Sequence, residues 1–187
     1  MQNQKIRFMI ETAMCAALAL ILDQLSFSLP QGGSVSLSML PIFLLSFRWG
    51  FKGGLVNGFL FGMLQLALAP KIYYPIQGAI DYFVAFTVLG FAGLFANQVK
   101  AALQQGKKGM VATYITIGVF LGSLGRYLAH VMSGVVFFGE YAPPGTPALE
   151  YSLIYNLTYM GPSFALCSII LILVLSKSPR LTNTLTK

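Results

Sequence analysis

Apolar residues run through this chain in six long stretches that are separated by short polar or glycine-rich connections. Stretches of this length and continuity are typical of helices that cross a bilayer, which needs about 20 apolar residues for a hydrocarbon core of roughly 30 Å. The pattern therefore predicts an all-α integral membrane protein. We expect a compact bundle of six transmembrane helices, over residues 6–26, 38–49, 53–69, 76–98, 110–132 and 151–175.

The second stretch, 38–49, is too short to cross a bilayer at a rise of about 1.5 Å per residue. We expect either a tilted, part-length helix or a helix that continues into the preceding loop, and we count it as a crossing. The first stretch begins with basic residues, as a signal peptide does. It contains Glu11 and has no convincing cleavage site, so we interpret it as the first membrane helix.

Composition supports the same class of protein. Hydrophobic residues make up 56% of the chain and charged residues 9%, and the mean hydropathy is +0.74, which excludes an ordinary soluble domain. A chain of 187 residues has room for about six helices of roughly 20 residues with short connections, so we expect residues 1–187 to form a single membrane domain. Cys15 and Cys167 lie inside apolar stretches, away from any metal-ligand cluster, and predict neither a disulfide nor a metal site.

The basic residues indicate the orientation, because cytoplasmic loops collect Lys and Arg. With six crossings, ten of the twelve basic residues fall on one side, Lys71 lies in an outer loop and Arg126 lies within a helix. Both termini are therefore expected in the cytoplasm. Lys and Arg beside the membrane also explain the net charge of +7, so no nucleic-acid partner is needed.

Small residues recur every fourth position in two of the stretches. Gly54, Gly58 and Gly62 predict a close approach of helix backbones inside the bundle. Ala13 and Ala17 form a similar stripe on the first helix. By spacing alone this second stripe fits either internal packing or the docking of a partner protein.

Four polar residues interrupt or edge the apolar stretches: Asp81, Arg126, His130 and Asn156. An ionisable group at membrane depth costs about 3 kcal/mol on insertion scales and usually has a function. Counted along their helices, Asp81, Arg126 and Asn156 lie about 7 to 8 Å below the outer boundary. They are expected to share one site.

The fifth stretch places Gly118, Gly122, Arg126 and His130 on a single helix face, where the glycines are expected to leave space beneath the two polar groups. Aromatic residues gather at the same level, although a membrane-interface belt explains some of them. They are Tyr74, Tyr82, Phe138, Tyr151, Tyr155 and Tyr159.

Two interpretations of the polar residues remain open. Asp81 and Arg126 can form a buried ion pair that Asn156 and His130 complete with hydrogen bonds. Alternatively, the four groups line a pocket that opens to the outside. A carboxylate beside aromatic faces favours a flat, cationic, water-soluble molecule in such a pocket. We expect no second carboxylate near it.

Three sets of residues are distinctive in combination: GSVSLSMLP at 33–41, YPIQGAIDY at 74–82 with Ala85-Phe86 after it, and Ser133-Gly134 through Tyr141-Ala142-Pro143 to YSLIYN at 151–156. With these motifs, nearly the whole chain resembles the thiamine-specific S-component of energy-coupling-factor (ECF) vitamin transporters. Members of that family are six-helix subunits of the cell membrane of Gram-positive bacteria that capture thiamine from outside. Thiamine has a thiazolium cation and an aminopyrimidine, as the expected pocket requires.

The resemblance also implies roles for individual residues. Asp81 is the acidic partner of thiamine with Tyr82 next to it, while His130 and Phe138 flank the thiazolium. The remaining substrate-binding positions are Arg126, Gly134, Tyr151, Asn156 and Tyr74. Relatives carry Glu, Lys and Trp where this chain has Asp81, Arg126 and Phe138, and the expected lid at 27–36 has only glycine and serine where some relatives have Trp and Glu.

The resemblance implies partners as well. Ala13 and Ala17 match the stripe by which S-components dock on a transmembrane coupling subunit, which is joined to two ATPase subunits. The chain has no phosphate-binding loop of its own and needs no cofactor, so only its partners use ATP. The alternatives are an S-component or a stand-alone carrier for another cationic heterocyclic vitamin or precursor and, more remotely, an intramembrane enzyme that uses Asp81 and His130.

Overall fold

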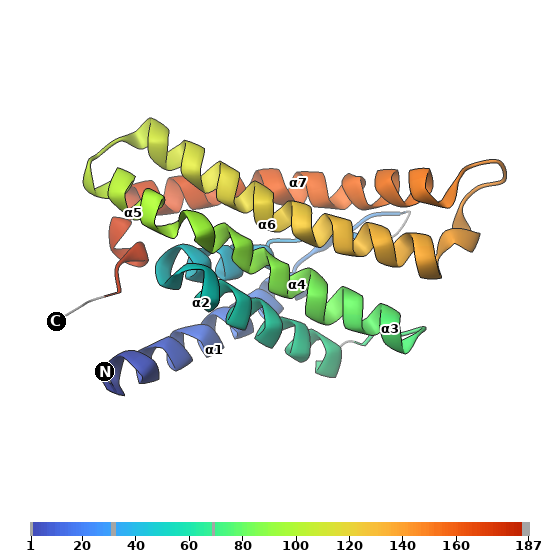
Figure 1. Cartoon of the computed structure of the whole chain (residues 1–187), viewed down its shortest axis with the longest axis horizontal. Coiled ribbons are helices and arrows are strands. Elements are labelled where there is room, and N and C mark those ends of the chain that lie inside the picture. Colours follow the sequence, from blue (N-terminus) through green and yellow to red (C-terminus); the bar gives the residue numbers. More distant parts are fainter. Residues whose placement is uncertain (1, 31–32, 69, 185–187) are drawn as a thin grey trace.

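The fold is described from a computed structural model that covers residues 2–30, 33–68 and 70–184, and it is almost entirely helical (Figure 1). Two short strands, β1 and β2, pair antiparallel between the first two helices, with Phe27 opposite Val35 and Ser28 opposite Ser34. The elements in chain order are α1 (Gln2–Gln24), β1 (Phe27–Ser28), β2 (Ser34–Val35), α2 (Met39–Leu68), α3 (Pro75–Gly78), η1 (Ala79–Val84), α4 (Ala85–Thr87), η2 (Val88–Phe95), α5 (Ala96–Gln104), α6 (Lys108–Phe137), η3 (Gly139–Tyr141), α7 (Ala148–Lys177) and η4 (Pro179–Thr182).

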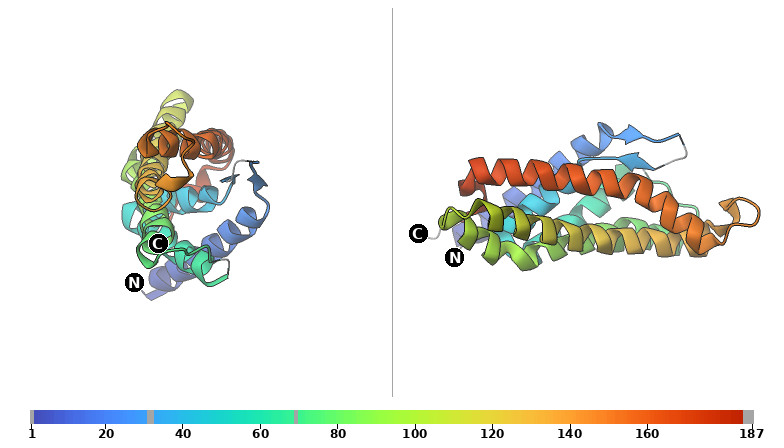
Figure 2. Two further views of the ribbon diagram at one scale, coloured as in Figure 1. Left: turned by 90° about the vertical axis from the view of Figure 1, so that its right-hand side faces the viewer. Right: turned by 90° about the horizontal axis from the view of Figure 1, so that it is seen from above.

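Within the described residues, four helical segments are long and apolar enough to cross a membrane: Met39–Leu68, Pro75–Gln104, Lys108–Phe137 and Ala148–Lys177. The prediction of a multi-pass helical membrane protein is therefore confirmed. The segments α6 and α7 lie side by side, and α1 packs on α2 (Figure 2). A core of large apolar side chains from α2, η2, α6 and α7 fills the space between them.

Residues 39–49 and 53–68 of the helices expected over 38–49 and 53–69 belong to α2, which has a sharp kink at Gly50, and residue 69 lies outside the described part of the chain. The φ of Gly50 is 77° and its ψ is −169°, a conformation that residues with a Cβ rarely adopt. The kink falls between the two expected helices. It separates a short part that begins at Met39 from a longer part that ends at Leu68.

The first expected helix, 6–26, became α1, which begins earlier and ends two residues earlier, at Gln24. The last three helices extend at both ends beyond the apolar stretches that predicted them. The stretch 76–98 became a continuous helical segment, Pro75–Gln104, with a π-helical turn at η1 and a 3-10 stretch at η2. The stretches 110–132 and 151–175 became Lys108–Phe137 and Ala148–Lys177. Hydropathy marks where the hydrocarbon begins, whereas a helical backbone continues into the polar interface, so the predicted ends are too short.

The glycine stripe of α2 packs inside the bundle, as predicted. A Cβ on Gly58 would overlap the carbonyl oxygen of Phe86, and one on Gly62 would overlap that of Tyr82. The absence of side chains therefore lets α2 touch the backbone of η1 and α4. This contact fixes the position of η1, the element that carries Asp81.

At the end of the molecule where both termini lie (Figure 1), Glu11 joins α1 to α2. Its carboxylate accepts hydrogen bonds from Arg7 Nε at 2.8 Å, Arg48 Nε at 2.5 Å and Trp49 Nε1 at 2.6 Å. Arg48 also donates to the backbone oxygen of Leu181 at 2.7 Å. The two termini are thus attached to one another through the kinked region of α2.

Candidate functional site

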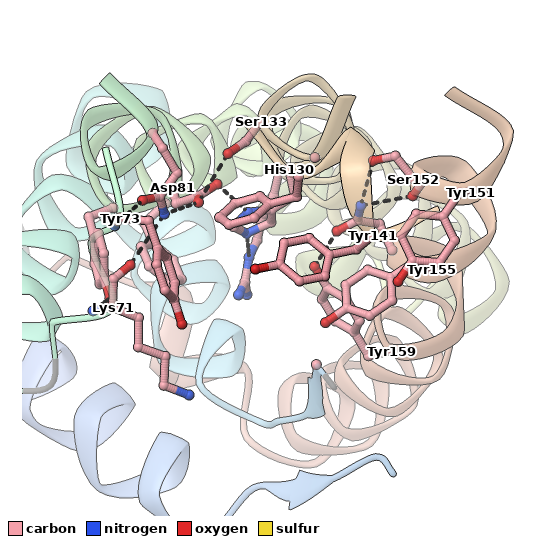
Figure 3. A pocket seen from close by; sticks show the side chains of 18 of the residues that line it. Lys71, Tyr73, Asp81, His130, Ser133, Tyr141, Tyr151, Ser152, Tyr155 and Tyr159 are labelled. Atoms are coloured by element: carbon pink, nitrogen blue, oxygen red, sulfur yellow. Dashed lines mark hydrogen bonds and ion pairs between the residues drawn. The ribbon is translucent and has the colours of Figure 1, made fainter. Parts of the chain in front are cut away.

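A cavity of about 480 Å³ lies toward the opposite end, between the β1–β2 hairpin and the helices η1, α6 and α7 (Figure 3). Its volume is that of a site for a small organic molecule. Most of its lining is aromatic or polar. The lining residues are Gly33, Gln65, Lys71, Tyr73, Gln77, Asp81, Tyr82, Phe86, Arg126, His130, Ser133, Gly134, Phe138, Tyr141, Tyr151, Ser152, Tyr155, Asn156 and Tyr159.

The structure brings eight of the nine predicted substrate-binding residues to this cavity. They are Asp81, Tyr82, Arg126, His130, Gly134, Phe138, Tyr151 and Asn156. Tyr74 is not among the lining residues: its ring stacks on Phe137 at a centroid distance of 5.4 Å and is 47% exposed. Its neighbour Tyr73 lines the cavity instead.

Asp81 lies in the π-helical turn η1 and has an unusually complete set of partners. Its Oδ1 is 2.9 Å from His130 Nδ1, and its Oδ2 accepts from Gln77 Nε2 at 2.6 Å and from Ser133 Oγ at 3.1 Å. Such turns are rare in helices and are frequent at functional sites. Three hydrogen-bond donors from two helices hold this carboxylate in place.

His130 links Asp81 to Arg126. Arg126 Nε donates to His130 Nε2 at 3.2 Å. Because arginine has only donors, His130 Nε2 accepts, and its Nδ1–H must donate to Asp81. The ring of His130 is then neutral and separates a positive group from a negative one.

Of the two interpretations left open by the sequence, the direct ion pair between Asp81 and Arg126 is not found among the described residues. In the described part of the chain the Asp81 carboxylate accepts a hydrogen bond from the neutral His130 ring, and the Arg126 guanidinium lies over the ring of Phe86, 4.5 Å from its centroid. Residues four positions apart are neighbours on a helix, so Arg126 contacts His130 and not Asp81. Arg126 remains one of the residues that line the cavity.

Contrary to expectation, Gly118 and Gly122 do not leave open space beneath Arg126 and His130. A Cβ on Gly118 would come to 3.0 Å from the backbone oxygen of Ala92, and one on Gly122 to 2.7 Å from that of Leu89. The backbone of η2 therefore fills the space that the missing side chains leave. The glycines bring helices together and do not enlarge the cavity.

Asn156 lies on the opposite wall, in a hydrogen-bond network within α7. Its Nδ2 donates to Ser152 O at 2.8 Å, and its Oδ1 accepts from the hydroxyl of Tyr159. Ser152 Oγ donates to Val131 O of α6 at 3.0 Å. Gly134 lies against this serine, where a Cβ would overlap Ser152 Oγ, so α6 and α7 touch closely here.

Aromatic rings form the rest of the wall. Tyr151, Tyr155 and Tyr159 follow one face of α7, with successive centroids 5.9 and 6.0 Å apart. Phe138 meets Tyr73 edge to face at 5.7 Å. These faces lie on both sides of the carboxylate and the arginine.

The expected lid at 27–36 is the β1–β2 hairpin, of which residues 31–32 lie outside the described part of the chain. Gly33 has a φ of 71°, and a Cβ there would overlap the ring of Tyr159. Ser36 holds the following segment in place, since its N–H donates to Ser163 Oγ at 3.2 Å and its Oγ to Asp23 Oδ1 at 3.3 Å. The hairpin therefore rests on the tyrosine wall of α7.

A second carboxylate lies near the cavity, contrary to the prediction. Asp23, at the end of α1, accepts a hydrogen bond from Gln65, a lining residue. Metal binding is not indicated: within residues 2–30, 33–68 and 70–184 no three His, Cys, Asp or Glu side chains gather closely enough to hold an ion. The arrangement is suited to binding a flat cationic molecule with hydrogen-bonding edges.

Several lining residues were not predicted. Gln77 is four residues before Asp81 and Ser133 three after His130, so helical spacing was a usable signal for both. Tyr155 and Tyr159 were grouped only as aromatic surface at this depth. Gly33 lies in the segment expected to form the lid, whereas Gln65, Lys71 and Tyr73 come from a connection or from α2, and no local pattern places them here.

The sequence of this chain is similar to those of known thiamine transporters. A family model described as "Thiamine transporter protein (Thia_YuaJ)" matches residues 9–183. Thiamine transporter ThiT of Bacillus subtilis is 49% identical over 98% of this chain and 97% of its own length, and that of Lacticaseibacillus paracasei is 32% identical over 83% and 80%. The solved structure of ThiT from Listeria monocytogenes has a TM-score of 0.91 at 29% identity, over 96% of this chain and 99% of that one. This chain belongs to the thiamine transporter protein family, which is a family of transporters and not of enzymes.

Proposed function

We propose that this protein captures thiamine at the outer face of the cell membrane of a Gram-positive bacterium and delivers it inward as the S-component of an ECF transporter. The observation that carries the proposal is the Asp81 carboxylate, held by three donors among aromatic rings in a cavity of about 480 Å³. Membership of the thiamine transporter family supports the choice of substrate.

The lining residues offer complementary groups to both rings of thiamine. Asp81 attracts the cationic ligand, with Tyr82 beside it, and His130 and Phe138 flank the thiazolium. Arg126 and Tyr151 supply hydrogen bonds, and the Gly134 backbone lies close by.

Asn156 has one specific group left for the ligand. Its Nδ2 is directed at Ser152, and one lone pair of its Oδ1 accepts from Tyr159. The second lone pair of Oδ1 is available to accept from an amino group such as that of the aminopyrimidine.

We propose six crossings with both termini in the cytoplasm. The kink at Gly50 supports counting α2 as two crossings, the first of them part-length. Both termini lie at one end of the bundle (Figure 1), and the basic residues Arg48 and Lys100 are together there, with Lys100 Nζ 2.8 Å from Arg48 O. The cavity lies toward the other end, as capture from outside requires.

The same proposal assigns a docking surface to α1. Ala13 and Ala17 are exposed, whereas Thr12 and Ala16 on the other face of α1 are buried against the bundle. A small-residue face that the fold leaves uncovered fits the transmembrane coupling subunit, which two ATPase subunits drive. Thiamine would be released inside when the whole subunit moves in the membrane on docking.

The first experiment is a calorimetric titration of ligand-stripped protein in detergent with thiamine, with riboflavin and biotin as controls. Calorimetry is preferable to tryptophan fluorescence because Trp49, the single tryptophan, contacts Phe8 and Glu11 and does not line the cavity. Saturable binding of thiamine alone is expected. Binding of another cationic heterocycle in its place would favour the alternative substrate, and uptake in cells without coupling subunits would favour a stand-alone carrier.

A further inference from the structure

The backbone of residues 71–74, which we call the mouth segment, is held by two side chains from the helix that follows it. The N–H of Lys71 donates to the hydroxyl oxygen of Tyr82 at 2.6 Å, and the carbonyl oxygen of Lys71 accepts from Gln77 Nε2 at 3.3 Å. The N–H of Tyr73 donates to Gln77 Oε1 at 3.0 Å. Side chains thus replace the secondary structure that this segment lacks.

Gln77 connects the mouth segment directly to the candidate substrate contact. The same Nε2 that donates to Lys71 also donates to Asp81 Oδ2 at 2.6 Å. Gln77 is only 3% exposed, so losing either partner would leave a buried polar group without compensation. The positions of the carboxylate and of the mouth segment are therefore linked through one amide group.

The mouth segment also forms part of the cavity wall. Lys71 and Tyr73 line the cavity (Figure 3), and the Tyr73 ring meets Phe138 edge to face at 5.7 Å. That contact joins the mouth segment to the end of α6 across the cavity. Release of the segment would remove this contact and open the wall beside Asp81.

We propose that Gln77 is a positioning residue that couples the Asp81 carboxylate to the mouth segment, so that a bound cation and a closed mouth stabilise each other. The inference rests on the proposed function, because it takes the ligand to be cationic thiamine. Coupling of this kind is reciprocal: if thiamine stabilises the closed segment, the closed segment slows the dissociation of thiamine. Gln77 itself need not touch the ligand.

Tryptic cleavage after Lys71 reports the opening of the mouth segment, because a protease cuts only chain that has locally unfolded. Gln77→Met keeps the volume and removes the amide. In ligand-free protein it should raise cleavage after Lys71 by about fivefold or more while leaving cleavage at Lys107 and Lys108 unchanged. Thiamine should slow the cut in the original protein and no longer do so in the variant.

The dissociation rate of radiolabelled thiamine is the second readout. Gln77→Met should raise it by about tenfold, with a smaller effect on association. Gln98→Met makes the same change at an exposed position of α5 and should alter neither readout. Tyr82→Phe, which removes the acceptor of the Lys71 N–H, should raise cleavage after Lys71 as well, and the double variant should show less than the product of the two effects.

Unchanged cleavage after Lys71 in Gln77→Met, or an equal rise at Lys71 and at Lys107 and Lys108, would overturn the proposal, the second because it reports general destabilisation. If thiamine dissociates from Gln77→Met as slowly as from the original protein, the proposal is overturned too. If Gln77→Met does not fold, the cleavage of Tyr82→Phe decides in its place. If the original protein does not bind thiamine, the proposed function fails, while cleavage of ligand-free protein still tests the link between Gln77 and the mouth segment.

Discussion

At the scale of single residues, the central feature of the candidate site is a carboxylate, that of Asp81, with hydrogen-bond donors on both of its oxygens. Asp81 has three hydrogen-bond partners, and Arg126 reaches it only through the ring of His130. A charge inside a membrane protein is tolerated when such partners replace water. The carboxylate is therefore fixed in place before any ligand arrives.

Asp81→Asn should weaken thiamine binding by about tenfold or more, because the amide keeps the shape of the carboxylate and loses its attraction for a cation. Calorimetry on the purified variant measures the loss, and its melting temperature checks that the fold is intact. Glu150→Gln removes a negative charge at an exposed position of α7 and should leave binding unchanged. Near-normal binding by Asp81→Asn would remove Asp81 from the site.

At the scale of elements, glycines determine how closely the parts of the site approach one another. Gly33 allows the β1–β2 hairpin to rest on Tyr159, and Gly62 allows α2 to touch the backbone of η1. Both contacts act on elements that carry or cover lining residues. A side chain added at Gly33 or Gly62 should therefore shift the elements of the site and leave its lining side chains chemically unchanged.

Gly33→Ala should weaken thiamine binding by about tenfold, because the new methyl group overlaps the Tyr159 ring and the backbone φ of 71° becomes unfavourable. Gly106→Ala separates the two causes, since Gly106 has a φ of 66° and open space around it. Titration of both variants gives the comparison. Equal affinity in the two would mean that the contact between hairpin and tyrosine does not matter for binding.

Gly62→Ala should destabilise the protein by about 2 kcal/mol, because the methyl group would meet the backbone oxygen of Tyr82 and force α2 away from η1. Gly109→Ala is the control, since a Cβ at that helical glycine meets nothing within 4 Å. Melting temperatures in the same detergent measure the difference. A Gly62→Ala variant as stable as Gly109→Ala would show that the helices can separate at little cost.

At the scale of the whole molecule, the two ends of the bundle differ. The cavity and its hairpin lie toward one end, and the termini, Glu11 and its arginine partners lie at the other. Between them α1 exposes Ala13 and Ala17 along with larger apolar residues such as Met9, Met14 and Leu18. The proposed binding and docking surfaces are therefore separate, and variants can affect them separately.

The double variant Ala13→Leu, Ala17→Leu should abolish thiamine uptake by cells and leave binding in detergent unchanged, because the added side chains keep a partner helix at a distance. Ala165→Leu adds similar bulk at an exposed position of α7 and should spare both. Uptake assays and calorimetry on the same variants provide the two measurements. Lost binding in the double variant would instead indicate that the stripe packs internally.

The amino-acid sequence by itself determined the class of the protein and much of the site. Long apolar stretches specify membrane helices because hydropathy is a local property, and spacing by four specifies the contact of Arg126 with His130 because helical geometry is local too. Counting residues from the helix ends brought Asp81 and Asn156 to one cavity. These inferences needed no knowledge of how one helix is rotated against another.

The tertiary structure decided the choices that depend on such rotation and on close approach. In the folded protein Asp81 is hydrogen-bonded to His130 and Gln77 and not to Arg126. Tyr73 and not Tyr74 lines the cavity, and the backbone of η2 fills the space above Gly118 and Gly122. Each outcome depends on distances between segments far apart in the chain. Those distances are set by packing across the whole bundle, so no local pattern contains them.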